Sequence, residues 1–271
     1  MVVQHNLTAM NSNRMLGLTT NSLAKSTEKL SSGYKINRAA DDAAGLAISE
    51  KMRRQVRGLT QASKNAQDGI SAVQTAEGAL NEVHDMLQRM TELATQAANG
   101  TNTSVDRGFI DAEVQALKSE ISRVASTTTF NEQNLLDGTF TSKNLQVGAE
   151  AGQYIKISIV AMSAGALGLA STVNVSTAEN ASAAISTIKA ALQSVSEQRS
   201  DLGAVQNRLE HTIANLDNVV ENTTAAESQI RDTDMATQMV KYSNTNILAQ
   251  AGQSMLSQAN QANQGVLSLL Q

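Results

Sequence analysis

The chain has 271 residues, of which 41% are hydrophobic and only 2% aromatic, and its formal net charge is −4. Compact enzymes usually line their cores and pockets with aromatic side chains, so the composition argues against an enzyme. The acidic balance argues against a general nucleic-acid binder. Proline and cysteine are absent. Nothing therefore interrupts a long helix, and neither a disulfide nor thiolate chemistry is available.

Both ends of the chain, residues 1–34 and 235–271, are rich in Asn, Gln, Ser and Thr and carry scattered apolar side chains. Helices of this composition bury little surface alone, and isolated helices are marginal in water. We expect both segments to be loose in a monomer and to fold when other copies supply neighbours. The N-terminus has no basic segment followed by an apolar one, so we expect no ordinary cleaved signal. No run approaches the length of a membrane span.

Two adjacent carboxylates, Asp41 and Asp42, precede an alanine-rich run. Adjacent acids can form a metal site or a general acid/base pair, or they can mark the start of a helix. A carboxylate just before a helix accepts backbone N–H groups and complements the helix dipole. Catalytic carboxylates have to face each other across a substrate, which neighbours at a helix start rarely do. We therefore interpret Asp41 and Asp42 as a helix start, by capping or by a structural salt bridge.

Residues 42–98 carry apolar side chains with a seven-residue repeat, which predicts one long helix of roughly 85 Å. The repeat consists of Met52, Leu59, Ala66, Val73, Leu80 and Leu87. Further apolar residues lie three or four positions after these, so that the two sets together form one apolar stripe along the helix, the seam: Val56, Ala62, Ile70, Ala76, Val83 and Met90. A turn at Asn99 and Gly100 separates this helix from a shorter one, expected over about residues 104–126.

Residues 139–160 alternate apolar and polar side chains around a GAEAG turn, which predicts a small β-hairpin. Residues 161–178 are expected to be a connector of small residues. The seven-residue repeat returns over residues 179–230, at Ile188, Val195, Leu202, Leu209 and Leu216. Because the two long helices match in length and period, we expect a mainly α fold. It is an elongated antiparallel bundle of long helices with a small β-hairpin, plus paired N- and C-terminal coiled-coil helices.

No motif in the chain predicts a catalytic residue, a metal site or a cofactor. The three histidines are far apart, and no H-E-x-x-H or Cys/His cluster is present, so a zinc site is not expected. A basic cluster follows Glu50, but no aromatic residue is interleaved for base stacking, so we interpret it as a solvated or intersubunit helix face. Four glycines in the first long helix, at 45, 58, 69 and 78, indicate either tolerance in a well-packed rod or close approach of neighbours.

Four stretches resemble bacterial flagellin: LSSGYKINRAADDAAGLAIS (30–49), GLTQASKNAQDGISAVQTAEGALNEV (58–83), RSDLGAVQNRLEHTIANL (199–216) and AQAGQSMLSQANQANQGVLSLLQ (249–271). The resemblance covers both ends and most of the chain. It implies a structural subunit that self-assembles into the extracellular filament of the bacterial flagellum for motility. It also implies a minimal type of flagellin, because the middle of the chain is too short for the variable outer domains.

The resemblance also divides the chain. Residues 1–41 and 231–271 would form the inner-core terminal helices with their spoke linkers, and residues 42–230 the outer-shell bundle with its hairpin. The inner-core residues expected to drive assembly are Leu7, Met10, Leu16, Leu23, Ile247, Leu248, Leu256, Val266, Leu267 and Leu270. The implied partners are other copies of the chain, the flagellar export chaperone, the type III export apparatus, the filament cap and the hook-associated proteins. Neither nucleic acid nor a membrane is an expected partner.

A motif in LQRMTELATQAAN (87–99) resembles the part of flagellin that Toll-like receptor 5 contacts. The positions that match are Gln88, Arg89, Leu93, Gln96 and Glu113. On a helix, residues 89, 93 and 96 form a stripe beside the expected seam. We therefore expect Leu93 to be a part-exposed apolar side chain next to a guanidinium, as binding hot spots often are.

Two other classes of protein remain as alternatives. A hook–filament junction protein shares the terminal segments but does not polymerise into a filament. A coiled-coil scaffold would form stable isolated dimers. The long match over residues 58–83 favours a flagellin over the first alternative.

Overall fold

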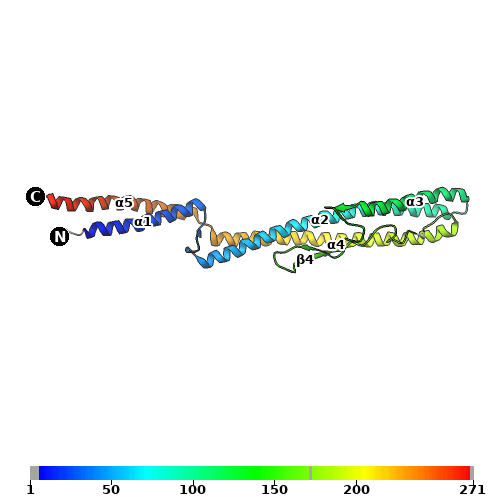
Figure 1. Ribbon diagram of the computed structural model, residues 1–271, viewed down its shortest axis with the longest axis horizontal. Coiled ribbons are helices and arrows are strands. Elements are labelled where there is room, and N and C mark those ends of the chain that lie inside the picture. The colour runs from blue at the N-terminus through cyan, green and yellow to red at the C-terminus, as the bar shows by residue number, and fades with distance from the viewer. Residues whose placement is uncertain (1–5, 171–172, 269–271) are drawn as a thin grey trace. The chain divides into compact units, whose positions relative to one another are not determined.

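The computed structural model describes residues 6–170 and 173–268, with residues 262–268 described by their backbone alone. The helices are α1 (Leu7–Ser32), α2 (Ala43–Ala98), α3 (Ser104–Thr127), α4 (Ala178–Arg231) and α5 (Met235–Ser268). Four short strands lie between α3 and α4: β1 (Thr129–Phe130), β2 (Gln133–Asn134), β3 (Lys143–Gln146) and β4 (Tyr154–Ile157). The predicted mainly α fold with a small hairpin is confirmed (Figure 1).

The chain divides into two compact units, and the long helices α2 and α4 each contribute to both. The terminal unit consists of the described parts of 1–56 and 221–271, and the central unit consists of residues 57–220. This boundary lies inside the two long helices, whereas the resemblance places the division at residues 41 and 231.

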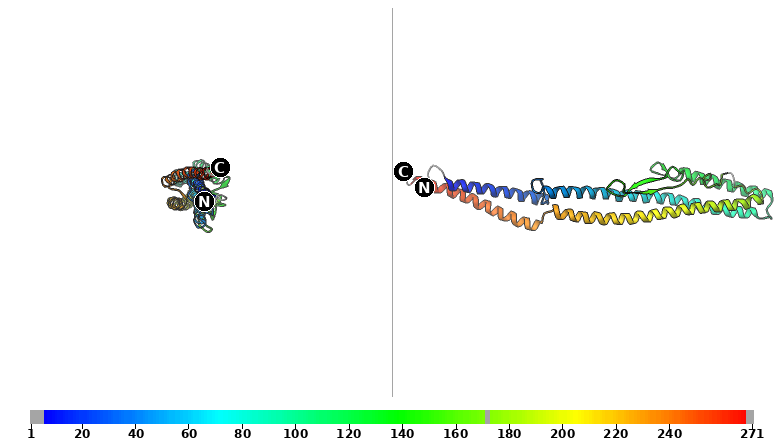
Figure 2. Two further views of the ribbon diagram at one scale, coloured as in Figure 1. Left: turned by 90° about the vertical axis from the view of Figure 1, so that its left-hand side faces the viewer. Right: turned by 90° about the horizontal axis from the view of Figure 1, so that it is seen from below.

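In the terminal unit, α1 and α5 lie side by side (Figures 1 and 2). The Asn6 side-chain amide donates to the Ala259 carbonyl at 3.1 Å. Gly252 of α5 faces Leu16 so closely that an added Cβ would lie 3.3 Å from the Leu16 Cδ1. Gly33 caps the C-terminal end of α1, and its φ of +76° is a conformation that glycine adopts without strain.

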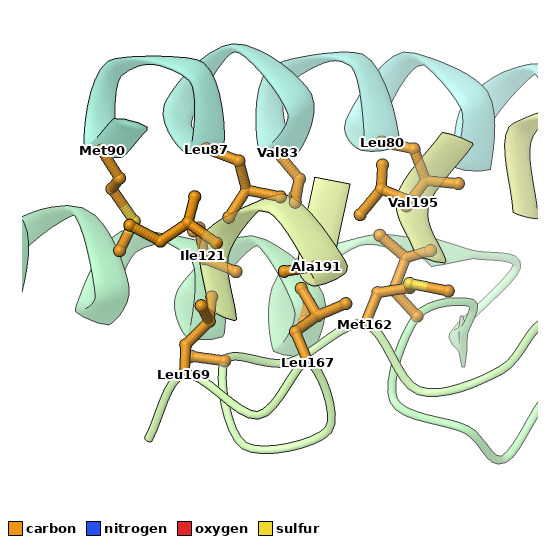
Figure 3. Packing of buried hydrophobic residues seen from close by; sticks show 14 of the residues in the cluster. Leu80, Val83, Leu87, Met90, Ile121, Met162, Leu167, Leu169, Ala191 and Val195 are labelled. Carbon is orange, nitrogen blue, oxygen red and sulfur yellow. The ribbon is translucent and has the colours of Figure 1, made fainter. Parts of the chain in front are cut away.

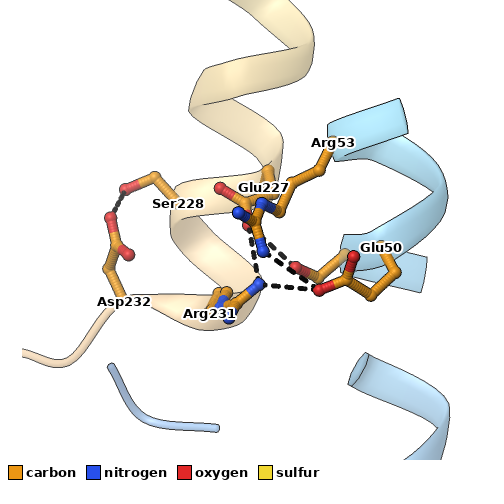
Figure 4. A network of polar contacts seen from close by, with 7 residues as sticks. Glu50, Arg53, Glu227, Ser228, Arg231 and Asp232 are labelled. Atoms are coloured by element: carbon orange, nitrogen blue, oxygen red, sulfur yellow. Dashed lines mark hydrogen bonds and ion pairs between the residues drawn. The ribbon is translucent and has the colours of Figure 1, made fainter. Parts of the chain in front are cut away.

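The links between the helices of the terminal unit are held by backbone and polar contacts. The Lys35 N–H donates to the Arg231 carbonyl at 2.6 Å, and the Thr233 N–H donates to the Gly33 carbonyl at 2.9 Å. Figure 4 shows the Arg231 guanidinium between Glu50 and Glu227, at 3.1 Å and 4.0 Å. Its guanidinium carbon also lies 4.6 Å from the centre of the Tyr34 ring. Arg231 therefore ties the end of α4 to the first turns of α2.

The core of the central unit lies between α2, α3 and α4 (Figure 3). All five repeat residues predicted on the second long helix are buried, as are Leu59, Ala66, Val73, Leu80 and Leu87 on the first. The segment 161–178, which was predicted to be only a connector, also contributes to this core. Its apolar side chains close one side of this core, and the buried ones are Met162, Ala164, Leu167, Leu169, Val173 and Val175.

Two antiparallel hairpins cover α2 in the central unit. The predicted one pairs β3 with β4, with Leu145 opposite Ile155. The smaller one, β1 with β2, was not predicted, because its strands have two residues each. Its two-residue turn consists of Asn131 and Glu132, both with positive φ, at 48° and 62°. Such a turn matches the twist of the strands, but a glutamate in this conformation is strained.

Three of the four glycines singled out in α2 lie where another chain segment approaches closely. A Cβ at Gly58 would lie 2.8 Å from the Ala149 Cβ, and a Cβ at Gly69 would collide with Leu145. A Cβ at Gly45 would meet the Asp42 carboxylate and the Ile36 side chain. Gly78 has open space around it. Close approach within the chain therefore explains Gly45, Gly58 and Gly69.

Helix α3 begins with a reciprocal cap. The Asp106 carboxylate accepts from the Thr103 hydroxyl at 2.7 Å and from the Thr103 N–H at 2.9 Å. In return, the Asp106 N–H donates to the Thr103 hydroxyl at 3.3 Å. The hydrogen bond from the Thr103 hydroxyl, followed by that from its N–H, holds the pKa of Asp106 below its ordinary value.

We expect this cap to make the start of α3 sensitive to acid. Because the pKa of Asp106 is lower in the folded than in the unfolded chain, its stabilisation is fully present above the unfolded pKa of about 3.9. It is lost as the pH falls through the folded value. A carboxyl NMR titration should give Asp106 a midpoint below that of an unfolded reference, and Thr103→Val should raise that midpoint. An ordinary midpoint in the unmodified protein would contradict the capping role.

Candidate functional site

The adjacent carboxylates at the start of α2 have separate structural contacts. Asp42 accepts from the Gly45 N–H at 2.9 Å, which caps the first turn of α2. Asp41 accepts from the N–H groups of Arg38 and Asn37, at 3.1 and 3.2 Å, and thereby closes the preceding turn. These two backbone bonds, that of Arg38 first, hold the pKa of Asp41 below its ordinary value. Across residues 6–170 and 173–268, no three His, Cys, Asp or Glu side chains gather as metal ligands.

Most of the exposed large apolar side chains of the terminal unit lie on α1 and α5. Leu7 and Met10 of α1 are 67% and 65% exposed, and Ile247 and Leu248 of α5 are 63% and 59% exposed. Other large apolar side chains on these helices are also exposed: Met15, Leu18, Met235, Met239, Val240 and Met255. Exposed apolar surface of this extent is typical of a protein–protein interface.

The remaining assembly residues predicted from the sequence fall into two groups. Leu16, Leu23 and Leu256 are partly buried, and Leu16 packs against α5. The side chains of Val266 and Leu267, and the whole of Leu270, lie outside the described residues. The pair α1–α5 thus buries a narrow set of apolar side chains and leaves a broader set in solvent.

The stripe predicted on α2 is only partly on the surface. Gln88, Arg89 and Gln96 are exposed. Arg89 bridges to α3, because its guanidinium lies 3.0 Å from the Glu113 carboxylate and 2.9 Å from that of Glu92. The ion pairs with Glu92 and Glu113 raise the pKa of Arg89 above its ordinary value, and the hydrogen bond to Glu92 makes the largest contribution.

Leu93 is buried, although it was predicted to be partly exposed. Its side chain is only 2% exposed and belongs to the core of the central unit, together with Met90, Ala94 and Ala97. The expectation of a part-exposed Leu93 was therefore wrong. Near its C-terminal end α2 packs against both α3 and α4, so the buried face is wider than a seam with one partner. The exposed part of the predicted patch consists of Gln88, Arg89, Gln96 and Glu113.

Within the described part of the chain, no helix has both the length and the apolar character to cross a membrane.

Comparison with known protein families decides what kind of chain this is. A model of the bacterial flagellin N-terminal helical region matches residues 3–141, and a model of the bacterial flagellin C-terminal helical region matches residues 185–270. The chain belongs to the bacterial flagellin family. Flagellins are structural proteins of the flagellar filament, so the chain is a structural subunit of this extracellular assembly.

Relatives of this flagellin match it over its whole length. A flagellin of Halalkalibacterium halodurans is 55% identical over 271 residues, and a flagellin of Bacillus subtilis is 49% identical over 303 aligned positions. A flagellar filament 31.3 kDa core protein of Treponema maltophilum is 50% identical over 286 aligned positions. In all three comparisons the alignment covers 100% of both chains. These relatives favour a filament subunit over a junction protein or a scaffold.

Solved structures show the same helical fold. A crystal structure of Bacillus cereus flagellin superposes with a TM-score of 0.51 at 31% identity, covering 56% of this chain and 88% of that one. A putative flagellar hook-associated protein from Vibrio parahaemolyticus gives a TM-score of 0.59, covering 71% of this chain and 100% of that one. Its identity is 14%, so this second likeness concerns the fold alone.

Proposed function

We propose that this flagellin polymerises through its terminal helices, with α1 and α5 in the inner wall of the filament and the bundle of residues 42–230 in the outer shell. The observation that carries the proposal is the exposed apolar surface on α1 and α5. Full burial of a Leu, Ile or Met side chain contributes about 1.5–3 kcal/mol. Burial of Leu7, Met10, Ile247 and Leu248 against other copies therefore supplies a large driving force for assembly.

The exposed apolar surface on α1 and α5 also explains why the two terminal segments would change from disordered to helical on assembly. In a monomer the exposed apolar side chains gain nothing from the helical conformation, whereas ordering the backbone costs about 1–2 kcal/mol per residue. In a filament, neighbouring copies bury them and offset this cost. We infer that residues 1–34 and 235–271 are disordered in the monomer and helical in the filament, as expected for segments that fold on binding.

Removal of residues 1–34 and 235–271 is expected to abolish polymerisation and to leave a soluble helical bundle. Electron microscopy of seeded protein and circular dichroism of the truncated chain check the two parts of this result. A point variant makes the test sharper: Ile247→Asp should prevent filament growth without changing the melting of the bundle. Its matched control is Val160→Asp, at a residue of the central unit that is 51% exposed. Filaments from the truncated chain would refute the proposal.

The resemblance to flagellin supports further partners. We propose that the type III export apparatus of the flagellum exports the chain with the help of an export chaperone. We also propose that the filament cap and the hook-associated proteins bind its assembled form. The disorder inferred for both ends fits passage through a narrow channel.

We propose, as a second function, that Toll-like receptor 5 recognises the monomer at the surface formed by Gln88, Arg89, Gln96 and Glu113. The observation that favours it is the bridge from Arg89 to Glu113. It holds an arginine in a fixed position between two helices, and arginine is enriched among interface hot spots. Leu93 lies in the core beneath this surface, so its role would be to stabilise the fold that carries Arg89 and not to contact the receptor.

A further inference from the structure

A basic pocket of the terminal unit lies between α1 and α5, next to the segment that precedes α2. It has a volume of about 160 Å³. The residues of α1 that line it lie three or four positions apart and so share one face of the helix: Ser22, Lys25, Ser26 and Lys29. Helix α5 contributes Gln238 and Lys241, one turn apart, and Asp41 completes the lining. Three lysines from two helices therefore line one small space.

The positive charge of this pocket is not balanced. No carboxylate among the described residues forms an ion pair with Lys25, Lys29 or Lys241. Asp41 is the one acidic residue of the lining. Backbone N–H groups of the preceding turn lower its pKa most, and the nearby charges of Lys29 and Lys25 lower it further. One carboxylate against three ammonium groups leaves two positive charges uncompensated.

A buried hydroxyl group also lines the pocket. Ser26 is only 2% exposed, and its hydroxyl forms no hydrogen bond with another group in the described part of the chain. A buried polar group without a partner is costly and rare in native proteins. Ser22 and the Gln238 amide add further neutral donors. Hydroxyl and amide donors beside lysine ammonium groups are the donor set of an oxyanion site.

The terminal segments of neighbouring copies cannot supply the missing negative charge. Residues 1–34 and 235–271 contain a single acidic side chain, Glu28, and it already pairs with Arg38 at 2.9 Å. If α1 and α5 become buried among the same helices of other copies, the lysines of the pocket lose water without gaining a carboxylate. Burial of unpaired charge is strongly unfavourable. The compensating anion therefore has to come from solution.

We infer that this pocket binds a small oxyanion of the phosphate type when α1 and α5 are folded. A cavity of roughly 150 Å³ holds a benzene molecule, and phosphate is smaller than benzene, so the ion fits. The inference rests on the proposed polymerisation and names a ligand of the assembled state. Because the pocket requires both terminal helices, the anion binds the filament and not the monomer. A ligand that binds one state alone favours that state by mass action, so the anion promotes assembly.

Phosphate binding at constant ionic strength tests the site in the unmodified protein. Sedimentation of filaments with radiolabelled inorganic phosphate should recover about one phosphate per subunit, and monomers should bind none. At a phosphate concentration of about ten times its Kd, the monomer concentration in equilibrium with filaments should fall about tenfold. Reference samples contain chloride in place of phosphate, so that screening of charge is equal.

The double variant Lys25→Gln, Lys29→Gln distinguishes a bound anion from a general effect of salt. It leaves one lysine of the pocket, Lys241, opposite Asp41, so no positive charge remains to be compensated. Filaments of this variant should form without phosphate, and phosphate should no longer lower the monomer concentration. The matched control is Lys64→Gln, Lys189→Gln, at two exposed lysines of the central unit, and it should keep the phosphate dependence. Exclusion of phosphate from protein surfaces in general would promote both variants alike.

Three outcomes would count against these proposals in different ways. If filaments form but bind no phosphate, and phosphate acts equally on both variants, the pocket is not an oxyanion site and polymerisation stands. If the variant at Lys25 and Lys29 fails to assemble whereas the control assembles, the lysines pair with a carboxylate of a neighbouring copy, and the inference is overturned as well. If the unmodified protein forms no filament under any condition, the proposed function itself fails.

Discussion

Replacement of Leu202 by alanine is expected to lower the free energy of unfolding of the central unit by about 2–5 kcal/mol. The Leu202 side chain is 1% exposed and belongs to the main core cluster. Its truncation removes apolar atoms from the core and leaves a cavity that two long packed helices cannot easily close. The loss is expected to be large because both the transfer term and the cavity term are present.

Thermal and denaturant unfolding, followed by circular dichroism, measure this change. Ser200→Ala is the matched control, since Ser200 is exposed on the same helix two residues away. Equal melting of the two variants would mean that the seven-residue repeat of α4 does not mark the buried face. The same comparison tests whether burial of this repeat stabilises the bundle, because the repeat is the pattern from which α4 was predicted.

The long helices were predictable because their pattern extends over many turns. A seven-residue repeat sustained across α2 and α4 has few alternative interpretations, and the predicted limits of 42–98 and 179–230 lie within one residue of Ala43–Ala98 and Ala178–Arg231. The absence of proline supports the same conclusion. Helix α3 and the β3–β4 pair were also predicted, since each has a clear apolar periodicity.

Short elements were harder to predict. The β1–β2 hairpin has two residues per strand, so no alternation could be detected, and its turn contains Glu132 where a glycine would have signalled it. The connector at 161–178 appeared featureless because its apolar residues follow no regular period. They are buried because the hairpins and α3 leave one side of the core open, and this depends on contacts between segments far apart in the sequence.

The error at Leu93 has a specific cause. A seven-residue seam describes a helix that packs against one partner. Arg89 of α2 bridges to Glu113 of α3, and the core cluster that contains Leu93 also contains residues of α4 such as Ile188. With two partners, α2 buries two adjacent stripes, and Leu93 lies on the second. The periodicity of α2 alone contains no information about a second partner.

This correction changes the expected behaviour of two variants at the proposed receptor surface. Leu93→Ala should destabilise the central unit by about 2–5 kcal/mol, because it truncates a buried side chain. Arg89→Ala should leave the melting temperature nearly unchanged, because the guanidinium is exposed and its ion pairs with Glu92 and Glu113 lie at the surface. The two substitutions therefore separate a structural role from a contact role within one turn of α2.

Receptor binding is the measurement that distinguishes these roles. Arg89→Ala is expected to weaken binding of the monomer to the Toll-like receptor 5 ectodomain roughly thirtyfold, as truncation of an arginine hot spot does. Arg123→Ala is the matched control. Arg123 is also an exposed arginine paired with a glutamate on its own helix, at Glu120, but it lies outside the proposed surface. Equal binding by the Arg89 and Arg123 variants would reject the receptor role.

For Leu93→Ala, binding of the monomer to the receptor should fall only in proportion to the unfolded fraction, because this side chain supports the surface from within the core. A loss of affinity in fully folded Leu93→Ala protein would instead mean that the receptor reads the position of the α2 backbone above it.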